Sequence, residues 1–282
     1  MLKSKSSANS HPIRLVLSDL DGTLLDPAKA ITPRAKAAVS ELGVRGIEFS
    51  VCSGRPARGM LDIVREAQVS LPYGALNGGV ILSKDHQVTS EVRLSPSHAK
   101  AALAYFTERK VETWLFTARD WLVLNFECRL VAREVNAVKF EPTVVTSFEP
   151  YMQEAVKIVG VSEDHERLAL LELDIKEHLG PGAFASRSNL SYLDVTHERA
   201  NKGEFLRWIA GERGIAPENI LSIGDMPCDA EMFPHSGLGI AMGSSPQSVK
   251  DRATHVTGAN DAEGFARAIE EHVLDLKEYC GE

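Results

Sequence analysis

Cysteine is scarce in this sequence, and the familiar cysteine motifs are missing. The 282 residues include four cysteines, at positions 52, 128, 228 and 280. None of them forms a CxxC pair, and their spacings fit no zinc-binding pattern. Together with the lack of a signal peptide, this cysteine usage predicts a protein of the reducing cytoplasm.

Long apolar runs and an excess of positive charge are also missing. No apolar stretch approaches the roughly 20 residues that a membrane-spanning helix needs, so we expect no membrane segment. The formal net charge of -8 argues against a nucleic-acid-binding protein, which normally carries a basic face. No GxGxxG motif follows the first predicted strand, which argues against a dinucleotide-dependent oxidoreductase.

The composition that remains is that of a globular protein with a substantial core. Hydrophobic residues make up 44% of the chain and charged residues 25%, so disorder is not the default. Residues 1–12 are polar and predict a flexible tail. Strands at 14–18 and 48–52 alternate with helices, one of them capped by Thr32 and started by Pro33. The same alternation returns near the end, with Asn201 capping a helix from Lys202. This pattern predicts a Rossmann-like, doubly wound parallel sheet.

The middle of the chain has a different pattern. Between residues 84 and 190, predicted strands and helices follow one another as in an antiparallel sheet with helices on one face. We therefore expect a core domain formed by residues 13–83 and 191–282, with a second, α+β domain inserted at 84–190. The expected fold class is α/β.

Two acidic residues directly follow the first predicted strand. Asp19 and Asp21, in DLDGTLLD, lie at the strand's carboxyl end, the edge where open α/β sheets bind ligands. Two carboxylates this close repel each other unless a cation lies between them or one is protonated. Hard cations prefer oxygen ligands, so a magnesium site is plausible. An ordinary Asx turn explains the same residues equally well.

Three later segments also lie at a strand end or a helix start. In SGRP, Ser53 offers a hydroxyl and backbone N–H groups to an anion, although a capping serine is the simpler explanation. Lys202 lies in the first turn of a helix, where a cation is unfavourable without a nearby anion; a solvated lysine is the ordinary alternative. In GDMPCD, Asp225 and Asp229 follow an apolar strand, and a turn with a capping aspartate explains them too. A single sheet could gather all four segments along one edge.

In this order, the four segments resemble the four motifs of the haloacid dehalogenase superfamily, over nearly the whole chain. About 34 residues separate Asp19 from Ser53, too few for a cap domain, whereas about 149 separate Ser53 from Lys202. This spacing and the mixed pattern of the insertion resemble the Cof-type phosphatases with a type IIB cap. The segment NGG at 77–79 resembles one that lies near the phosphate site in that subfamily.

The resemblance implies a Mg²⁺-dependent phosphatase that acts on small phosphorylated metabolites, such as sugar phosphates, through an aspartyl-phosphate. Asp19 would be the nucleophile. Asp21 would protonate the leaving alcohol and later activate water, so we expect acidic surroundings to keep it protonated at the start. The implied metal ligands are the Asp19 carboxylate, the Asp21 backbone carbonyl and the Asp225 carboxylate.

The remaining site residues are also implied by the resemblance. The groups that would hold the phosphate are Ser53, Gly54, Arg55, Asn77 and Lys202, and Lys202 would also be catalytic. Thr23 and Asp229 would support the site from behind, Asp229 by orienting Lys202 or a metal-bound water. Many relatives carry asparagine at the positions of Met226 and Cys228. Because cysteine is a soft ligand that suits magnesium poorly, we expect no metal role for Cys228.

The expected cap would lie over the site, exclude water and select the substrate. Candidate contacts near its end are Arg187, Asn189 and Tyr192. Trp114 and Trp121 are expected to pack in the cap core.

Two other functions remain open at this stage. One is a phosphomutase, or a phosphatase dedicated to a disaccharide or glycerate phosphate. The other is a non-catalytic protein that binds a phosphorylated ligand, although the complete set of acids and the lysine argues against it. The sequence does not indicate an oligomeric state.

Overall fold

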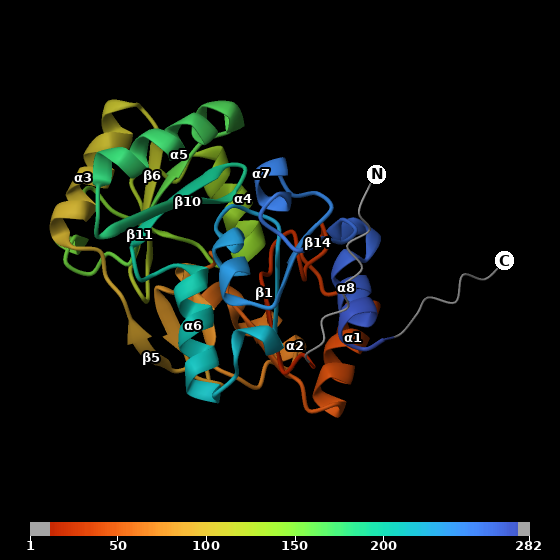
Figure 1. The fold of residues 1–282 in the computed structure, drawn as a ribbon. Coiled ribbons are helices and arrows are strands. Elements are labelled where there is room, and N and C mark those ends of the chain that lie inside the picture. Colours follow the sequence, from red (N-terminus) through yellow and green to blue (C-terminus); the bar gives the residue numbers. More distant parts are fainter. Residues whose placement is uncertain (1–11, 276–282) are drawn as a thin grey trace, which may run out of the picture.

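A computed structural model describes residues 12–275. The expected flexible tail, except for Pro12, lies outside the described residues, as do Cys280 and the end of the expected last helix. The molecule has two lobes (Figure 1), with the first and the last described elements, β1 and α8, in one lobe and the middle of the chain in the other. The expected fold class, a parallel α/β core with an inserted α+β cap, is confirmed.

The core lobe is built on a five-stranded parallel sheet. Its strand order is β14-β13-β12-β1-β2, and all four pairings are parallel. The strands are β1 (Leu15–Ser18), β2 (Glu48–Val51), β12 (Ile220–Gly224), β13 (Leu238–Ala241) and β14 (His255–Val256). The carboxyl ends of β1, β2 and β12 therefore meet at one edge, which collects the segments that follow them.

Helices cover both faces of this sheet because successive strand residues point to opposite sides. Val16 packs in the same cluster as Leu42 of α1 and Ile269 of α8, whereas Leu15 packs with Ile209 of α6. The helices of this lobe are α1 (Pro33–Val44), α2 (Leu61–Glu66), α6 (Lys202–Arg213), α7 (Gln247–Lys250) and α8 (Gly264–His272). Figure 1 shows α1 and α8 side by side and α6 on the opposite side of the sheet.

Two predicted helix caps are confirmed. The Thr32 side chain accepts a hydrogen bond from the Ala35 N–H at 3.1 Å. The Asn201 side chain accepts one from the Glu204 N–H at 2.9 Å, so that Lys202 opens α6 as predicted. These caps satisfy N–H groups that a helix start leaves without intrahelical partners.

A small antiparallel sheet lies beside the core sheet. It consists of β3 (Tyr73–Ala75), β4 (Val80–Leu82) and β5 (Val88–Glu91). Strand β5 lies within residues 84–190, the range expected for the cap, and it pairs with β4 of this small sheet.

The second lobe is built on a six-stranded sheet with the order β10-β11-β9-β6-β7-β8. All its pairings are antiparallel except that of β7 with β8. The strands are β6 (Glu112–Phe116), β7 (Trp121–Val123), β8 (Thr143–Val144), β9 (Lys157–Val161), β10 (Ala183–Asn189) and β11 (Tyr192–His197). Strand β11 therefore pairs with the cap although it follows residue 190, and the exact domain limits stay a prediction.

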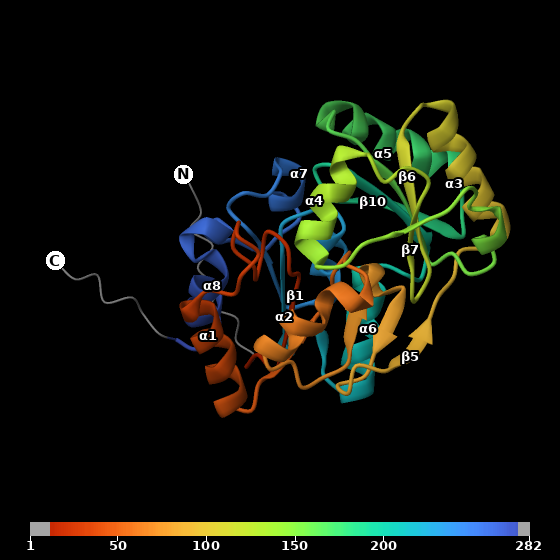
Figure 2. The ribbon, with the colours of Figure 1, turned by 180° about the vertical axis from the view of Figure 1, so that it is seen from behind.

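The two faces of the cap sheet have different neighbours. Ile158 and Leu193 pack with α3 (Pro96–Glu108) and α5 (His165–Leu179) on the outer face. On the inner face, Val159 and Tyr192 join the cluster that contains α4 (Arg129–Val138) and parts of the core lobe. Figure 2 shows α4 between the cap sheet and the core. Side chains on the inner face of the cap sheet are thus directed at the core lobe.

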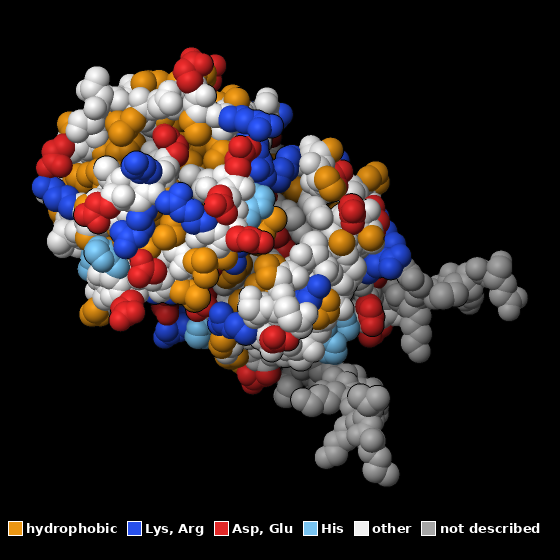
Figure 3. All heavy atoms as spheres, turned by 90° about the horizontal axis from the view of Figure 1, so that it is seen from above, with side chains coloured by type: hydrophobic (Ala, Val, Ile, Leu, Met, Phe, Trp, Pro, Cys, Tyr) orange, Lys and Arg blue, Asp and Glu red, His pale blue; other side chains and the backbone are white. Residues whose placement is uncertain are grey.

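No helix among residues 12–275 is long and apolar enough to cross a membrane. Seen from above, acidic and basic side chains are interspersed on the surface of both lobes (Figure 3). The expected absence of a nucleic-acid partner stays a prediction.

Candidate active site

Asp19 lies at the carboxyl end of β1, beside the end of β12. Its backbone N–H donates to the Ile223 carbonyl at 3.0 Å, which ties the two strand ends together. The side chain is buried, and burial, with the charges of Asp229 and Asp21, raises the pKa of Asp19 to about 7, although Lys202 acts in the opposite direction. A carboxylate in such a place needs a cation to stay ionised at neutral pH.

Lys202 supplies one positive charge to this group of acids. Its ammonium donates to Asp19 Oδ1 and to Asp229 Oδ1, each at 2.5 Å, and the side chain is fully buried. Helix α6 carries it at its first residue, and a Cβ at the next residue, Gly203, would lie 2.4 Å from the Glu231 carbonyl oxygen. The start of α6 therefore packs tightly against the segment that follows β12, and this packing fixes Lys202 between Asp19 and Asp229.

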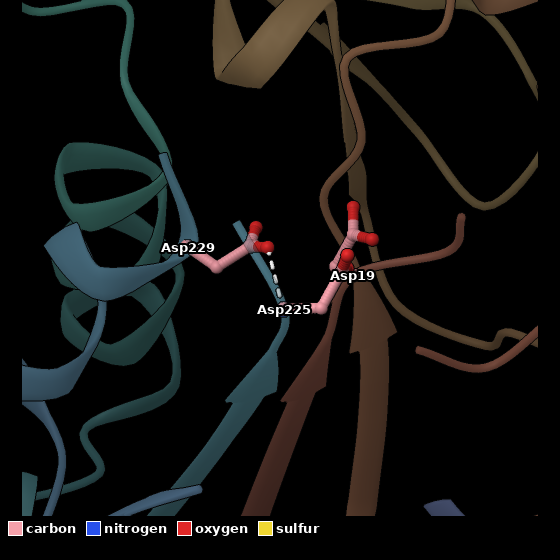
Figure 4. Close-up of side chains that lie close together, drawn as sticks. All are labelled: Asp19, Asp225 and Asp229. Carbon is pink, nitrogen blue, oxygen red and sulfur yellow. Dashed lines mark hydrogen bonds between the residues drawn. The ribbon is translucent and has the colours of Figure 1, made fainter. Parts of the chain in front are cut away.

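Asp225 follows β12 and faces Asp19 across the sheet edge (Figure 4). The Thr23 hydroxyl donates to Asp225 Oδ1 at 3.1 Å. Gly22 has a φ of +89°, and a Cβ there would lie 2.5 Å from Asp225 Oδ2, so only glycine allows this approach. Burial and the charges of Asp229 and Asp19 raise the pKa of Asp225 well above its usual range.

Asp229 holds the loop after β12 in place. Its Oδ2 accepts from the backbone N–H groups of Asp225 and Met226 at 2.9 and 2.8 Å, and the first of these bonds is drawn in Figure 4. Its Oδ1 accepts from Lys202. Both oxygens of Asp229 are thus occupied by neighbouring donors, and the supporting role that the resemblance implies for it stays a prediction.

The acids at this edge fit a divalent metal ion. One oxygen each from Asp19, Asp225 and Asp229 lies within 4.8 Å of the others. Asp229 has both oxygens engaged, so the carboxylates with free oxygens to offer a metal ion are those of Asp19 and Asp225. Oxygen ligands suit a hard cation such as Mg²⁺. The charge of such an ion would offset the burial and the neighbouring acids that raise the pKa of Asp19 and of Asp225.

Asp21 is in basic surroundings, which corrects the expectation of acidic ones. Arg55 and Lys29 both bind its carboxylate, Lys29 through Oδ1 at 2.7 Å. Burial alone would raise the pKa of Asp21, but the hydrogen bonds and charge of Arg55, with those of Lys29, hold it well below its usual range. Asp21 is therefore ionised in this arrangement. The sequence shows the neighbouring acids but not which cations fold over them.

The turn after β2 presents donors to the same edge. Ser53 is buried and its Oγ accepts from the Arg55 N–H at 3.2 Å. A Cβ at Gly54 would lie 3.2 Å from the Ser188 Cβ of the cap, so the cap approaches the turn closely. Among the described residues, the Gly54 N–H has no acceptor. The turn thus holds a hydroxyl and a backbone N–H that could bind an anion, and phosphate binding there stays a prediction.

Arg55 and Asn77 have other partners in the structure. Besides Asp21, the Arg55 guanidinium donates to the carbonyls of Gly59 and Ala137, at 3.2 and 2.8 Å. Asn77 is buried and its Nδ2 donates to Asp194 Oδ2 at 2.6 Å. Both lie beside the serine turn, and their contact with a phosphate stays a prediction.

A cavity of about 780 Å³ opens from these residues between core and cap. Its wall includes Asp19, Asp21, Ser53, Gly54, Arg55 and Asp225 from the core. The cap contributes aromatic and charged side chains, namely Trp114, Phe116, Arg133, Glu134, Lys139, Lys157, His165 and Tyr192. The volume suits a ligand of metabolite size.

The cap residues expected to contact a ligand divide into two groups. Asn189 and Tyr192 line the cavity, and the Tyr192 hydroxyl donates to Glu134 at 2.9 Å. Arg187 does not line it, because its guanidinium pairs with Glu172 of α5 at 2.9 Å. Trp114 and Trp121 are buried and pack edge-to-face, with their ring centroids 5.1 Å apart. Trp114 also forms part of the cavity wall.

Sequence reasoning missed two charged residues of the cap sheet. Lys157 opens β9, in the apolar run KIVGV, and Asp194 interrupts β11, in YLDVTH. Both are buried and ion-paired to each other at 3.1 Å. A charged residue inside an otherwise apolar strand is the signal that would have identified them, since such residues are seldom buried without a partner.

A family model described as haloacid dehalogenase-like hydrolase matches residues 16–269. The chain belongs to this family. It is 26% identical over 288 residues to the 5-amino-6-(5-phospho-D-ribitylamino)uracil phosphatase of Bacillus subtilis, covering 92% of this chain and 98% of that protein. The recognition of a Cof-type phosphatase is confirmed, as is the expectation of an enzyme.

Solved structures of haloacid dehalogenase-like proteins share the fold. A haloacid dehalogenase-like hydrolase from B. subtilis superposes with a TM-score of 0.83 at 21% identity, covering 92% of this chain and 99% of the other. A sugar phosphatase of subclass IIB has a TM-score of 0.76 at 22% identity, covering 92% and 98%. At this identity the likeness shows the fold alone.

Proposed function

We propose that this phosphatase hydrolyses phosphate monoesters of small metabolites with the help of Mg²⁺, through an aspartyl-phosphate on Asp19. The observation that carries the proposal is the position of the Asp19 carboxylate. It lies on the cavity wall, bound on one side by Lys202 and faced on the other by Asp225. A carboxylate that could attack phosphorus, a buried cation and a second carboxylate that could bind a metal lie together here, and this arrangement supports the proposal.

In the first step, an Asp19 oxygen forms a bond to phosphorus while the bond from phosphorus to the leaving oxygen breaks. Asp21 donates a proton to that oxygen and becomes a carboxylate. In the second step, Asp21 takes a proton from water as the water oxygen attacks phosphorus. Inorganic phosphate departs and the Asp19 carboxylate is restored. Ser53, the Gly54 N–H and Lys202 hold the transferring oxygens.

The acid step requires a rearrangement at Asp21. Its carboxylate is bound by Arg55 and Lys29 and holds no proton in the arrangement described above. Before it can act as an acid, Asp21 has to leave Arg55 and take up a proton. A substrate phosphate that competes for Arg55 would produce this change, since Arg binds phosphate as readily as carboxylate.

Mg²⁺ would be held by the carboxylates of Asp19 and Asp225 and by the backbone carbonyl of Asp21. It would supply positive charge to the phosphoryl oxygens. The cap wall, with Trp114, Phe116 and Tyr192, would shield the site from water and contact the leaving group.

The direct test is release of inorganic phosphate from p-nitrophenyl phosphate and from a panel of phosphorylated metabolites, with Mg²⁺ and with EDTA. We expect turnover only with the metal. Asp19→Asn should lower the rate at least about 1,000-fold, because an amide is a poor nucleophile. Asp62→Asn, an exposed position in α2, is the matched control and should keep full activity. Turnover that survives in Asp19→Asn would exclude the proposed nucleophile.

A further inference from the structure

A lysine of the cap reaches into the phosphate-binding turn of the core. Lys157 is the first residue of β9 and is almost completely buried. Its ammonium donates to the Gly54 carbonyl at 2.6 Å and to Asp194 Oδ2 at 3.1 Å, and it lies 4.9 Å from the centre of the Phe116 ring. Lys157 also lines the cavity. A buried cation with such short contacts holds its neighbours in place.

Asp194 links this lysine back to the core. The same oxygen, Oδ2, also accepts from Asn77 Nδ2 at 2.6 Å, and the Asn77 N–H donates to the Ser53 carbonyl at 2.8 Å. The cap therefore touches the serine turn at two points, directly through Lys157 and indirectly through Asp194 and Asn77. Asp194 and Lys157 lie on the inner face of the cap sheet, since Asp194 pairs with Val159, two residues from Lys157.

The carbonyl that Lys157 binds belongs to the peptide group that orients Ser53. The N–H of that peptide is the Arg55 N–H, which donates to Ser53 Oγ. An ammonium on the carbonyl polarises the peptide and strengthens its N–H as a donor. With Oγ fixed as an acceptor, the hydroxyl hydrogen of Ser53 is left to point at a ligand. The carbonyls of Ser53 and Gly54 each accept a hydrogen bond, from the Asn77 N–H and from Lys157. The Gly54 N–H is therefore fixed beside the Ser53 hydroxyl.

We propose that Lys157 is a positioning residue that completes the phosphate-binding turn from the cap. The inference rests on the proposed function, because it assigns Lys157 to the phosphate site of that reaction. Since the lysine belongs to the cap and the turn to the core, the turn is fully ordered only while the two lobes are in contact. Phosphate binding and cap contact therefore favour each other.

Three variants separate positioning from mere structural support. Lys157→Met removes the ammonium but leaves the Asp194 carboxylate buried with Asn77 as its one remaining donor, which destabilises the fold. The double variant Lys157→Met with Asp194→Asn removes both charges, keeps the shapes and should regain stability. Lys100→Met is the matched control, because Lys100 lies on α3 of the cap, is half-exposed and pairs with Glu149 away from the cavity.

Steady-state kinetics with p-nitrophenyl phosphate and calorimetric binding of inorganic phosphate, both with Mg²⁺, give the readout. We expect Lys157→Met and the double variant each to lose about 10- to 100-fold in kcat/KM and to bind phosphate more weakly, while thermal stability recovers in the double variant alone. Lys100→Met should match the wild type. A double variant that regains wild-type kcat/KM and phosphate affinity together with its stability would overturn the proposal.

Failure of the proposed function would look different. A wild type that binds phosphate in a Lys157-dependent manner yet turns over no ester contradicts the phosphatase mechanism and supports the role of Lys157. An active wild type whose Lys157→Met variant keeps full phosphate affinity contradicts the role of Lys157 and leaves the phosphatase mechanism standing.

Discussion

Arg55 holds Asp21 through two parallel hydrogen bonds, from Nε to Oδ2 at 2.5 Å and from Nη2 to Oδ1 at 2.8 Å. The same guanidinium donates to the Ala137 carbonyl near the end of α4 at 2.8 Å. One side chain of the serine turn thus binds both the proposed general acid and the cap. The ionisation of Asp21 and the contact between the lobes depend on the same group.

Replacement of Arg55 by methionine should destabilise the protein at neutral pH. The Asp21 carboxylate would stay largely enclosed, with Lys29 as its remaining cationic partner. We therefore expect the free energy of unfolding to fall by about 1–3 kcal/mol. Because Arg55 holds the pKa of Asp21 below its usual value in the folded state, the stability that this pair contributes is present above the unfolded pKa of about 3.9. It is lost as the pH falls further. Urea unfolding at pH 7 and at pH 3.5 measures both effects.

Lys29→Met provides the control for Arg55. Lys29 binds the same carboxylate, but its side chain is 40% exposed, so its removal should cost less than about 1 kcal/mol. Equal losses for the two variants would contradict the leading role that the geometry gives to Arg55.

Mg²⁺ should stabilise the protein more at pH 8 than at pH 5.5. Burial raises the pKa of Asp19 to about 7 and that of Asp225 well above its usual range. Without metal, the folded state therefore takes up protons at these sites more readily than the unfolded state, and their contribution to stability falls as the pH rises through 7. Mg²⁺ binds the ionised carboxylates, so it competes with protons at pH 5.5 and less so at pH 8.

Thermal unfolding in MgCl₂ and in EDTA at equal ionic strength tests this dependence. At pH 8 we expect an increase in Tm of about 2–6 °C. Asp225→Asn, which removes one proposed ligand, should abolish the increase. The same increase at both pH values, or its survival in Asp225→Asn, would contradict a metal site formed by Asp19 and Asp225.

The sequence predicts those parts of this molecule that depend on local order and spacing. Strand ends in a parallel sheet meet at one edge, so the positions of Asp19, Ser53 and Asp225 follow from the strand pattern alone. The ionisation of Asp21 does not, since it depends on Arg55 and Lys29, which fold over it from other segments. Pairing partners of strands are equally non-local, so the sequence pattern does not show that β5 pairs with β4.

Gly22→Ala should weaken Mg²⁺ binding, although residue 22 is not one of the proposed metal ligands. Gly22 has a φ of +89°, and a Cβ there would meet the Asp225 carboxylate at 2.5 Å. The new methyl group would displace either Asp225 or the loop after β1. Gly211→Ala in α6, where nothing lies within 4 Å of the added Cβ, should leave binding unchanged and stabilise the helix by up to about 1 kcal/mol. Titration with Mg²⁺, followed by Tm, measures both. Wild-type affinity in Gly22→Ala would show that the approach of residue 22 to Asp225 is unimportant.

Lys202→Met should produce the largest loss of stability, and one that depends on pH. The variant leaves the buried carboxylates of Asp19 and Asp229 without their shared cation, which we expect to cost about 3–5 kcal/mol at pH 8. In the wild type, Lys202 lowers the pKa of Asp19, which is about 7. Removal of Lys202 should therefore raise this pKa above its wild-type value. Protonation then relieves the folded state as the pH falls, and the loss should be smaller at pH 5.5.

Lys36→Met is the control for Lys202, because Lys36 is half-exposed and forms a surface pair with Glu66. It should cost less than about 1 kcal/mol at either pH. Urea unfolding of both variants at pH 5.5 and pH 8 gives the comparison. If Lys202→Met lowered the free energy of unfolding by the same amount at both pH values, Asp19 would not be the group that takes up the proton. The cation would then act on Asp229 alone, and the pairing of Lys202 with the proposed nucleophile would lose its electrostatic basis.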